Sequence, residues 1–126
     1  MKILSIEDSA IAQRNLRRLV TSMGYEFVEA TEIAQGYTLA QTPVDLILLD
    51  VNLPDGNGLD LARRLRAEHI PTPIIILTGD VLRYSHEKAL QAGANEFVSK
   101  PYDVNEMRDL IAAHLKASRP PQPSES

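Results

Sequence analysis

The sequence predicts an α/β domain in which a parallel sheet is covered by helices on both faces. Five short apolar runs alternate with stretches whose apolar residues recur at helical spacing. Two of the runs, 44–49 and 73–77, are rich in Ile and Leu and almost continuously apolar, which is typical of strands buried on both sides. Strands that alternate with helices imply right-handed crossovers and therefore a parallel sheet.

The first strand is expected at Lys2–Ile6, directly at the N-terminus, and a helix follows it. Ser9 is a favourable N-cap for this helix, and Gly24 ends it. The apolar residues between them recur with a period of about 3.6 and are predicted to face the sheet. They are Ala12, Leu16, Leu19, Val20 and Met23.

The middle of the chain is expected to add two strands and two helices. The second strand covers Tyr25–Glu29, and the helix after it begins at a Thr31 cap and ends before Pro43. The third strand covers Val44–Leu49 and is followed by a helix over about 58–68. The inward residues of that helix are predicted to be Leu61, Ala62 and Leu65.

The last third of the chain is expected to add two more strands and helices. The fourth strand, Pro73–Leu77, precedes a helix that ends at the Ala-Gly pair 92–93. The fifth strand, Glu96–Ser99, leads into a helix over Val104–Ala117. The inward residues of this helix are predicted to be Val104, Met107, Leu110, Ile111 and Leu115. Residues 118–126 hold three of the eight prolines and are predicted to form a disordered tail or the stump of a linker.

The composition fits one domain, placed at 1–117, with a hydrophobic core of its own. Of the 126 residues 44% are apolar and none is Cys, which excludes disulfides, thiolate zinc sites and cysteine nucleophiles. The net charge of −4 argues against a general nucleic-acid binder. The longest apolar runs, such as 74–77, are far shorter than the ~20 residues of a membrane helix. The chain enters a strand at once, so we expect no signal peptide and a cytoplasmic protein that does not bind membranes.

Chemically active side chains follow four of the five predicted strands. Glu7 and Asp8 follow the first strand, Asp50 the third, Thr78 the fourth and Lys100 the fifth. Taken singly, each has an ordinary role as a cap, a turn residue or a solvated side chain. The carboxyl ends of parallel strands, however, meet at one edge of the sheet, where ligands bind in open α/β folds. The five residues therefore form one candidate site.

Three carboxylates at this edge need a cation, because each pair at about 4 Å repels by ~4 kcal/mol at an effective dielectric constant of about 20. Oxygen ligands without His or Cys select a hard ion, Mg²⁺ first and Mn²⁺ next, and its open positions suit phosphoryl oxygens. An ionised Asp is a nucleophile that needs no general base at neutral pH. With Mg²⁺ and Lys100 offsetting the charge of Asp50, and Thr78 donating a hydrogen bond to a phosphoryl oxygen, the chemistry points to an aspartyl phosphate.

Five motifs resemble those of receiver domains, the phosphoacceptor domains of response regulators in two-component signalling. They are Ile-Glu-Asp at 6–8, Leu-Leu-Asp-Val-Asn-Leu-Pro-Asp-Gly-Asn-Gly at 48–58, Leu-Thr-Gly at 77–79, Ala-Gly-Ala at 92–94 and Phe-Val-Ser-Lys-Pro-Tyr at 97–102. The resemblance covers residues 1 to about 117. It implies a flavodoxin-like, doubly wound (βα)5 fold with strand order 2-1-3-4-5.

The resemblance implies a role for each carboxylate of the site. Asp50 resembles the phosphoacceptor. Asp8 and Asp50 resemble the direct metal ligands, together with the backbone carbonyl of Asn52. Glu7, where the family more often has Asp, resembles the acidic partner that holds the metal through water.

The resemblance also implies how phosphorylation is read out. Thr78 and Lys100 match the switch hydroxyl and the lysine of the family, and the peptide bond between Lys100 and the proline after it is expected to be cis. Phe97 falls at the switch aromatic. Thr78 and Phe97 are expected to act as one bistable element that changes the surface of the fourth helix, the fifth strand and the fifth helix. Asn52 and Asp80, each two residues beyond a site residue, are expected to flank an attacking water and tune the lifetime of the phosphoryl group.

The partners implied are a histidine kinase or histidine phosphotransfer protein as donor and an output partner that no motif identifies. The resemblance also allows a homodimer through the surface of the fourth helix, fifth strand and fifth helix. The first helix is expected to carry the kinase contact, because Ile11, Asn15 and Arg18 lie at i, i+4 and i+7 on a face distinct from its core stripe. That face lies beside Glu7 and Asp8.

Two other classes of protein share the fold or the nucleophile. A flavodoxin-like FMN binder would need a hydroxyl-rich phosphate loop after the first strand, where Glu7 and Asp8 instead repel phosphate. A metal-dependent phosphatase with an Asp nucleophile would need a second Asp two residues later, where this chain has Asn52. We therefore expect a signalling phosphoacceptor and not an enzyme, either a stand-alone regulator or a receiver excised from a hybrid kinase or multidomain regulator.

Overall fold

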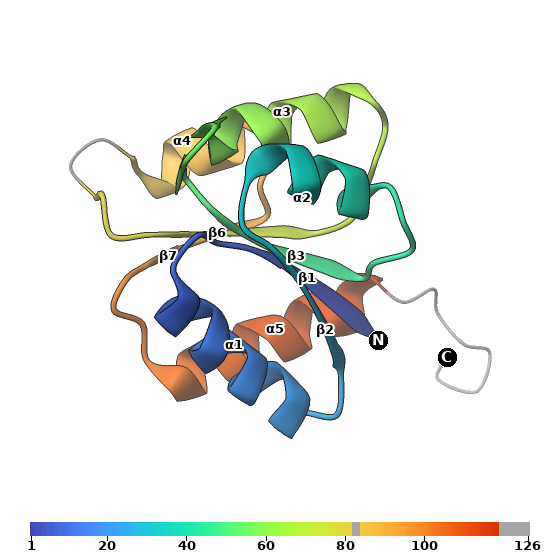
Figure 1. The fold of residues 1–126 in the computed structure, drawn as a ribbon, viewed down its shortest axis with the longest axis vertical. Helices are drawn as coiled ribbons and strands as arrows, with labels where there is room; N and C mark the ends of the chain where they lie inside the picture. Colours follow the sequence, from blue (N-terminus) through green and yellow to red (C-terminus); the bar gives the residue numbers. More distant parts are fainter. Residues whose placement is uncertain (82–83, 119–126) are drawn as a thin grey trace.

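A five-stranded parallel sheet forms the middle layer of the structure, a computed structural model that describes residues 1–81 and 84–118 (Figure 1). The strands are β1 (Lys2–Ile6), β2 (Glu26–Ala30), β3 (Leu46–Asp50), β6 (Ile74–Thr78) and β7 (Glu96–Ser99). Their order in the sheet is β2-β1-β3-β6-β7. The predicted order 2-1-3-4-5 is confirmed, since β4 and β5 form a separate small hairpin.

Helices cover both faces of the sheet, as predicted (Figure 1). The helices α1 (Ala10–Ser22) and α5 (Val104–Ser118) lie on one face. On the other face lie α2 (Ile33–Ala40), α3 (Gly58–Ala67) and α4 (His86–Gln91). Every residue of β3 and β6 is buried, because helices cover these central strands on both sides. The core is accordingly divided by the sheet into two hydrophobic clusters, one beneath each helical layer.

The boundaries of α1 agree with the sequence signals. The Ser9 side chain accepts a hydrogen bond from the Ala12 amide at 3.2 Å and caps the helix. Gly24, just beyond the helix, has a φ of 85°, a left-handed conformation that glycine adopts without strain.

The predicted Thr31 cap of the second helix is wrong. The N-cap residue of α2 is Glu32, and its side chain makes no capping hydrogen bond. The carboxylate of Asp55 takes this role from a distant segment, because it accepts the Ile33 amide at 2.7 Å and the Ala34 amide at 3.0 Å. Two hydrogen bonds to an ionised group are stronger than one to a hydroxyl, which explains why Asp55 displaces the local cap.

A short antiparallel hairpin between β3 and α3 was not predicted. It consists of β4 (Asn52–Leu53) and β5 (Gly56–Asn57), with Asn52 opposite Asn57. The Asn57 side chain then caps α3 by accepting the Leu59 amide at 2.7 Å. Strands of two residues are too short for a hydrophobic period to reveal them.

Helix α5 begins where predicted and is one residue longer, but its first turn differs. Met107, Ile111 and Leu115 are buried against the sheet, whereas the predicted inward residue Val104 is 53% exposed. Val104 begins the helix, where the chain has not yet reached the sheet face. The helix also includes Ser118, which was assigned to the tail, and the remainder of that predicted tail lies outside the described residues.

One arginine joins the segments that precede β6 and β7 at one edge of the sheet. The guanidinium of Arg66, near the end of α3, donates hydrogen bonds of 2.7 to 2.9 Å to four acceptors. These are the carbonyl oxygens of Ile70, Thr72 and Gly93 and the side-chain oxygen of Asn95. Burial lowers the pKa of Arg66, yet its planar fork matches several acceptors at once.

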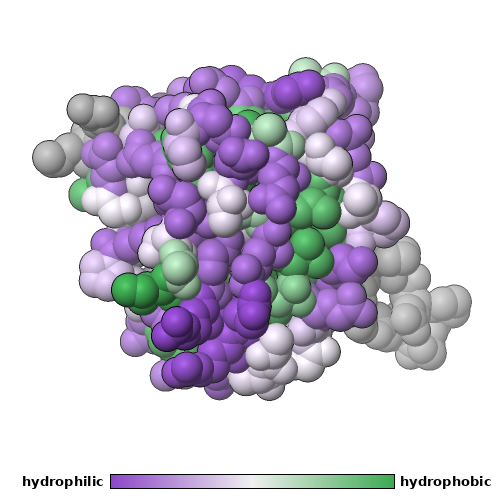
Figure 2. All heavy atoms as spheres, in the orientation of Figure 1, coloured by the Kyte–Doolittle hydropathy of each residue, from purple (hydrophilic) through white to green (hydrophobic). Residues whose placement is uncertain are grey.

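The surface is mainly hydrophilic on the face drawn in Figure 2, with hydrophobic side chains in smaller patches. Among the described residues, no helix has the length and apolar character needed to cross a bilayer.

Candidate active site

Three carboxylates meet at the carboxyl edge of the sheet. Glu7 and Asp8 follow β1, and Asp50 is the last residue of the adjacent strand β3. One carboxylate oxygen of each residue lies within 4.8 Å of the other two. Glu7 is 3% exposed and Asp50 9% exposed, while Asp8 is open to solvent. The predicted convergence of these side chains is confirmed.

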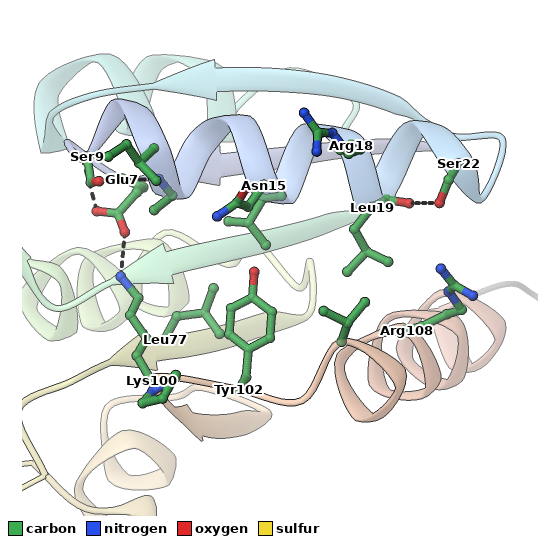
Figure 3. A pocket seen from close by; sticks show the side chains of 15 residues that line it. Glu7, Ser9, Asn15, Arg18, Leu19, Ser22, Leu77, Lys100, Tyr102 and Arg108 are labelled. Atoms are coloured by element: carbon green, nitrogen blue, oxygen red, sulfur yellow. Dashed lines mark hydrogen bonds and ion pairs between the residues drawn. The ribbon is translucent and has the colours of Figure 1, made fainter.

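Lys100 brings a positive charge into this cluster. Its ammonium makes an ion pair with Glu7, drawn in Figure 3, and lies 3.5 Å from Asp50 Oδ2. Burial alone would lower the pKa of Lys100, but the hydrogen bond to Glu7 and the charges of Asp50 and Glu7 outweigh burial and raise the pKa above its ordinary value. Lys100 is therefore charged at neutral pH.

The backbone holds Lys100 next to the strand that precedes it in the sheet. The Lys100 amide donates to the carbonyl oxygen of Thr78 at 2.8 Å, and the bond from Lys100 to Pro101 is cis, as expected. Thr78 ends β6 and is fully buried. Its hydroxyl oxygen accepts the Asp80 amide at 3.0 Å, which leaves the hydroxyl hydrogen to be donated elsewhere.

Asp50 is oriented by its own backbone neighbour. The Val51 amide donates to Asp50 Oδ1 at 2.7 Å, so the other carboxylate oxygen, Oδ2, is the one that lies nearest Lys100. The start of α3 also packs directly on this residue, because a Cβ at Gly58 would clash with the Asp50 carbonyl oxygen. Only glycine therefore fits at position 58.

A buried glutamine supports the segment that carries the acidic pair, and sequence reasoning missed it. Gln13 is 4% exposed, and its side-chain nitrogen lies 2.9 Å from the carbonyl oxygen of Glu7. The same nitrogen lies 3.0 Å from the Ala30 oxygen and 3.2 Å from the Ser5 oxygen. The available signal was a polar residue at helical spacing from Leu16 in the apolar stripe of α1.

The donor set of the cluster suits a hard divalent cation. Three carboxylates face one ammonium, which leaves two negative charges unbalanced. All the side-chain donors are oxygens, the ligands that Mg²⁺ and Mn²⁺ prefer over nitrogen or sulfur. The residues present therefore fit such an ion.

Comparison with known proteins agrees with this geometry. The model of the family described as response regulator receiver domain matches residues 3–112. The chain belongs to this family. Receiver domains are the phosphoacceptor domains of two-component signalling and not classical enzymes.

Two curated relatives of this receiver domain are transcriptional regulators. The cell cycle transcriptional regulator CtrA of Caulobacter vibrioides is 34% identical over 120 residues, covering 94% of this chain and 52% of the relative. The torCAD operon transcriptional regulatory protein TorR of Escherichia coli O157:H7 is 40% identical over 106 residues, covering 83% of this chain and 46% of the relative. The receiver domain thus spans about half the length of the curated relatives it matches.

Solved receiver domains superpose closely on this one. The receiver domain of TorR gives a TM-score of 0.84 at 35% identity, with 94% of this chain and 98% of that chain covered. The receiver domain of the sensor histidine kinase PA1611 from Pseudomonas aeruginosa PAO1 gives 0.82 at 30% identity, with 91% and 97% covered. That structure has a magnesium ion coordinated in its active site cleft.

Phe97 lies on the α4 side of the receiver domain. It is half-buried on β7, in register with Ile76 of β6, two residues before the pair formed by Thr78 and Ser99. Its ring meets that of His86 edge to face, at 6.5 Å between centroids and 74° between planes. His86 Nδ1 in turn lies 3.5 Å from a carboxylate oxygen of Glu96. The structure thus places Phe97 beneath α4, next to the strand that ends in Thr78.

The residues predicted to contact a kinase line a groove between α1 and α5. Ile11, Asn15 and Arg18 contribute the α1 wall of this groove, whose volume is about 880 Å³. Tyr102 and Arg108 lie on the opposite wall, and Glu7 and Lys100 close the end nearest the acidic cluster (Figure 3). Ile11 is 71% exposed. The three residues therefore do lie together and beside the site.

Proposed function

We propose that this receiver domain accepts a phosphoryl group on Asp50 from a phosphohistidine of a histidine kinase or histidine phosphotransfer protein. The observation that carries the proposal is the position of Asp50 beside both the acidic pair and the ammonium of Lys100. In the transfer, a carboxylate oxygen of Asp50 forms a bond to phosphorus. The bond from phosphorus to the histidine nitrogen breaks, and its electron pair stays on that nitrogen.

We assign the metal site to Asp8, Asp50 and the backbone carbonyl of Asn52, with Glu7 acting through water. The charge and oxygen donors of the cluster and the magnesium in the PA1611 receiver domain support this assignment. Bound Mg²⁺, or Mn²⁺ as a substitute, supplies positive charge that offsets the carboxylates and the incoming phosphoryl oxygens.

The residues around Asp50 then act on the phosphoryl group directly. Lys100 already has a charged ammonium 3.5 Å from Asp50, from where it can pair with a phosphoryl oxygen. Thr78 can donate its hydroxyl hydrogen, because the hydrogen bond that its oxygen accepts from the Asp80 amide does not use that hydrogen. Asn52 and Asp80 follow these two strand ends and are proposed to tune the lifetime of the phosphoryl group by flanking an attacking water.

We further propose that Thr78 and Phe97 pass the signal to the surface formed by α4, β7 and α5. Rotation of the Thr78 hydroxyl toward the phosphoryl group vacates space that the ring of Phe97, on the neighbouring strand, can enter. The output partner, or a second copy of the domain, then binds this surface. An amide chemical-shift comparison with beryllofluoride and Mg²⁺ tests this route: Thr78→Ala should abolish the shift at Phe97 that wild type shows.

The donor is proposed to dock on Ile11, Asn15 and Arg18, which line the groove between α1 and α5. The remaining proposals are a receiver unit that extends from residue 1 to the end of α5, with a linker or tail after it, and a cytoplasmic location. The variant that combines Ile11→Lys with Arg18→Glu should lose transfer from the kinase and still accept phosphoryl from acetyl phosphate. Equal loss from both donors would mean that the site, and not docking, was damaged.

The experiment that tests the phosphoacceptor is labelling with radioactive acetyl phosphate, with and without Mg²⁺. Wild type should acquire a base-labile label only with the ion, and Asp50→Asn should acquire none. The matched control is Asp109→Asn, which changes an exposed carboxylate on α5 that is not part of the cluster. Labelling of Asp50→Asn at the wild-type rate would contradict the assignment.

A further inference from the structure

The hairpin β4–β5 connects the phosphoacceptor to α3 and carries the carbonyl that we assign to the metal. Asn52 lies at its start, two residues after Asp50. Its base is closed by a hydrogen bond of 2.7 Å from the Gly58 amide to the Val51 carbonyl. Two-residue strands are not stable alone, so contacts outside the hairpin must fix its position.

Burial of Leu53 in the core and a 3.0 Å hydrogen bond from the Asn57 side chain to a tyrosine hydroxyl hold the two strands of the hairpin, and Asp55 holds its tip against α2. Its two carboxylate oxygens accept the first two amides of α2, from Ile33 at 2.7 Å and from Ala34 at 3.0 Å. The backbone hydrogen bonds from Ile33 and Ala34 lower the pKa of Asp55, so the carboxylate stays charged at neutral pH. The charge also interacts favourably with the positive end of the α2 dipole.

The neighbouring glycine brings the tip closer to the helix. Gly56 has a φ of 151°, and a Cβ at this position would lie 3.0 Å from the terminal methyl of Ile33. The tip is thus packed on the first residue of α2 as well as hydrogen-bonded to it. Glu32, the N-cap residue of α2, makes no side-chain hydrogen bond that could replace Asp55.

We propose that Asp55 is a positioning residue for the metal site, which fixes the hairpin against α2 and thereby keeps the Asn52 carbonyl beside the acidic cluster. This inference rests on the proposed function, because it takes the Asn52 carbonyl as a metal ligand. Linkage between the two interactions is reciprocal. If the hydrogen bonds between Asp55 and α2 strengthen metal binding, metal binding strengthens those hydrogen bonds by the same factor. The start of α2 therefore senses occupancy of the metal site.

The test compares Asp55→Asn and Asp55→Ala with wild type in magnesium titrations followed by calorimetry. Removal of both hydrogen bonds in Asp55→Ala should weaken Mg²⁺ binding about fivefold, a coupling at the low end of those between distinct sites. Asp55→Asn keeps one acceptor oxygen, so its Mg²⁺ affinity should lie between those of wild type and Asp55→Ala. Asp60→Asn is the matched control, since it removes an exposed carboxylate from the first turn of α3 outside the hairpin.

A second measurement separates positioning from simple stabilisation of α2. Mg²⁺ should slow hydrogen exchange of the Ile33 and Ala34 amides in wild type and in Asp60→Asn, but not in Asp55→Ala. Unchanged magnesium affinity in Asp55→Ala, or exchange at these amides that is indifferent to Mg²⁺ in wild type, would overturn the inference alone. A wild-type protein that binds no Mg²⁺ would overturn both this inference and the proposed metal site.

Discussion

Replacing Gln13 with alanine should lower the free energy of unfolding by about 1.5 kcal/mol, although Gln13 touches no ligand. Its side-chain nitrogen lies within 3.2 Å of three carbonyl oxygens and has two hydrogens, so it makes the equivalent of two hydrogen bonds. Each is worth about 1 kcal/mol, and the lost methylene adds about 0.8 kcal/mol. Two contributions oppose this loss: the better helix propensity of alanine returns a few tenths of a kcal/mol, and removal of the buried Gln13 Oε1, which has no hydrogen-bond partner among the described residues, returns about 1 kcal/mol.

Urea unfolding followed by circular dichroism measures this change, because the chain has no Trp to serve as a fluorescent reporter. The control is Gln91→Ala, which removes an exposed amide 3.5 Å from Glu87 and should change stability by less than about 0.5 kcal/mol. A loss below about 1 kcal/mol in Gln13→Ala would refute the reasoning, since water would then replace the amide at no cost.

Three further predictions concern other parts of the fold. Arg66→Lys should lower stability by about 2 kcal/mol in thermal unfolding, because an ammonium cannot bond all four acceptors of the guanidinium. Gly58→Ala should lower the free energy of unfolding by more than about 2 kcal/mol and slow phosphorylation, because the new methyl would clash with the Asp50 carbonyl. Gly79→Ala is the control: its methyl meets nothing within 4 Å, so stability and phosphorylation rate should both stay near those of wild type. The pKa of Asp55 in the folded protein lies below its ordinary value of 3.8. The stabilising contribution of Asp55 is therefore fully present above pH 3.8 and is lost as the pH falls through the lower folded-state pKa. In an NMR titration the chemical shift of the Ile33 amide should change with a midpoint below pH 3.8. A midpoint above pH 3.8 would contradict the role of Asp55 as the cap of α2.

The parallel sheet and the composition of the site could be predicted from the sequence because each depends on a regular feature, whereas the strand order was implied by the resemblance to receiver domains. Continuous Ile and Leu runs mark β3 and β6, which are buried on both faces. The rule that parallel strands end at one edge brings Asp50 and Lys100 together without knowledge of any distance.

The features that were not predicted depend on contacts that no local pattern records. Asp55 caps a helix that begins 22 residues before it, so Thr31, which is nearer in sequence, was the wrong choice. Gln13 binds backbone carbonyls, which every residue has, and its partners therefore leave no mark in the sequence. Val104 keeps the helical period of its neighbours but precedes the point where α5 reaches the sheet.

The hydrogen bonds of Arg66 lie where β6 and β7 begin, while Thr78 and Lys100 lie where the same two strands end. The residues that secure this part of the fold are thus separated from those of the proposed phosphotransfer chemistry by the length of a strand. Selection for a new partner or a different phosphoryl lifetime can therefore alter one end without loosening the other. A duplicated copy of this domain could diverge at the edge that carries the site while it keeps the hydrogen bonds of Arg66 at the other edge.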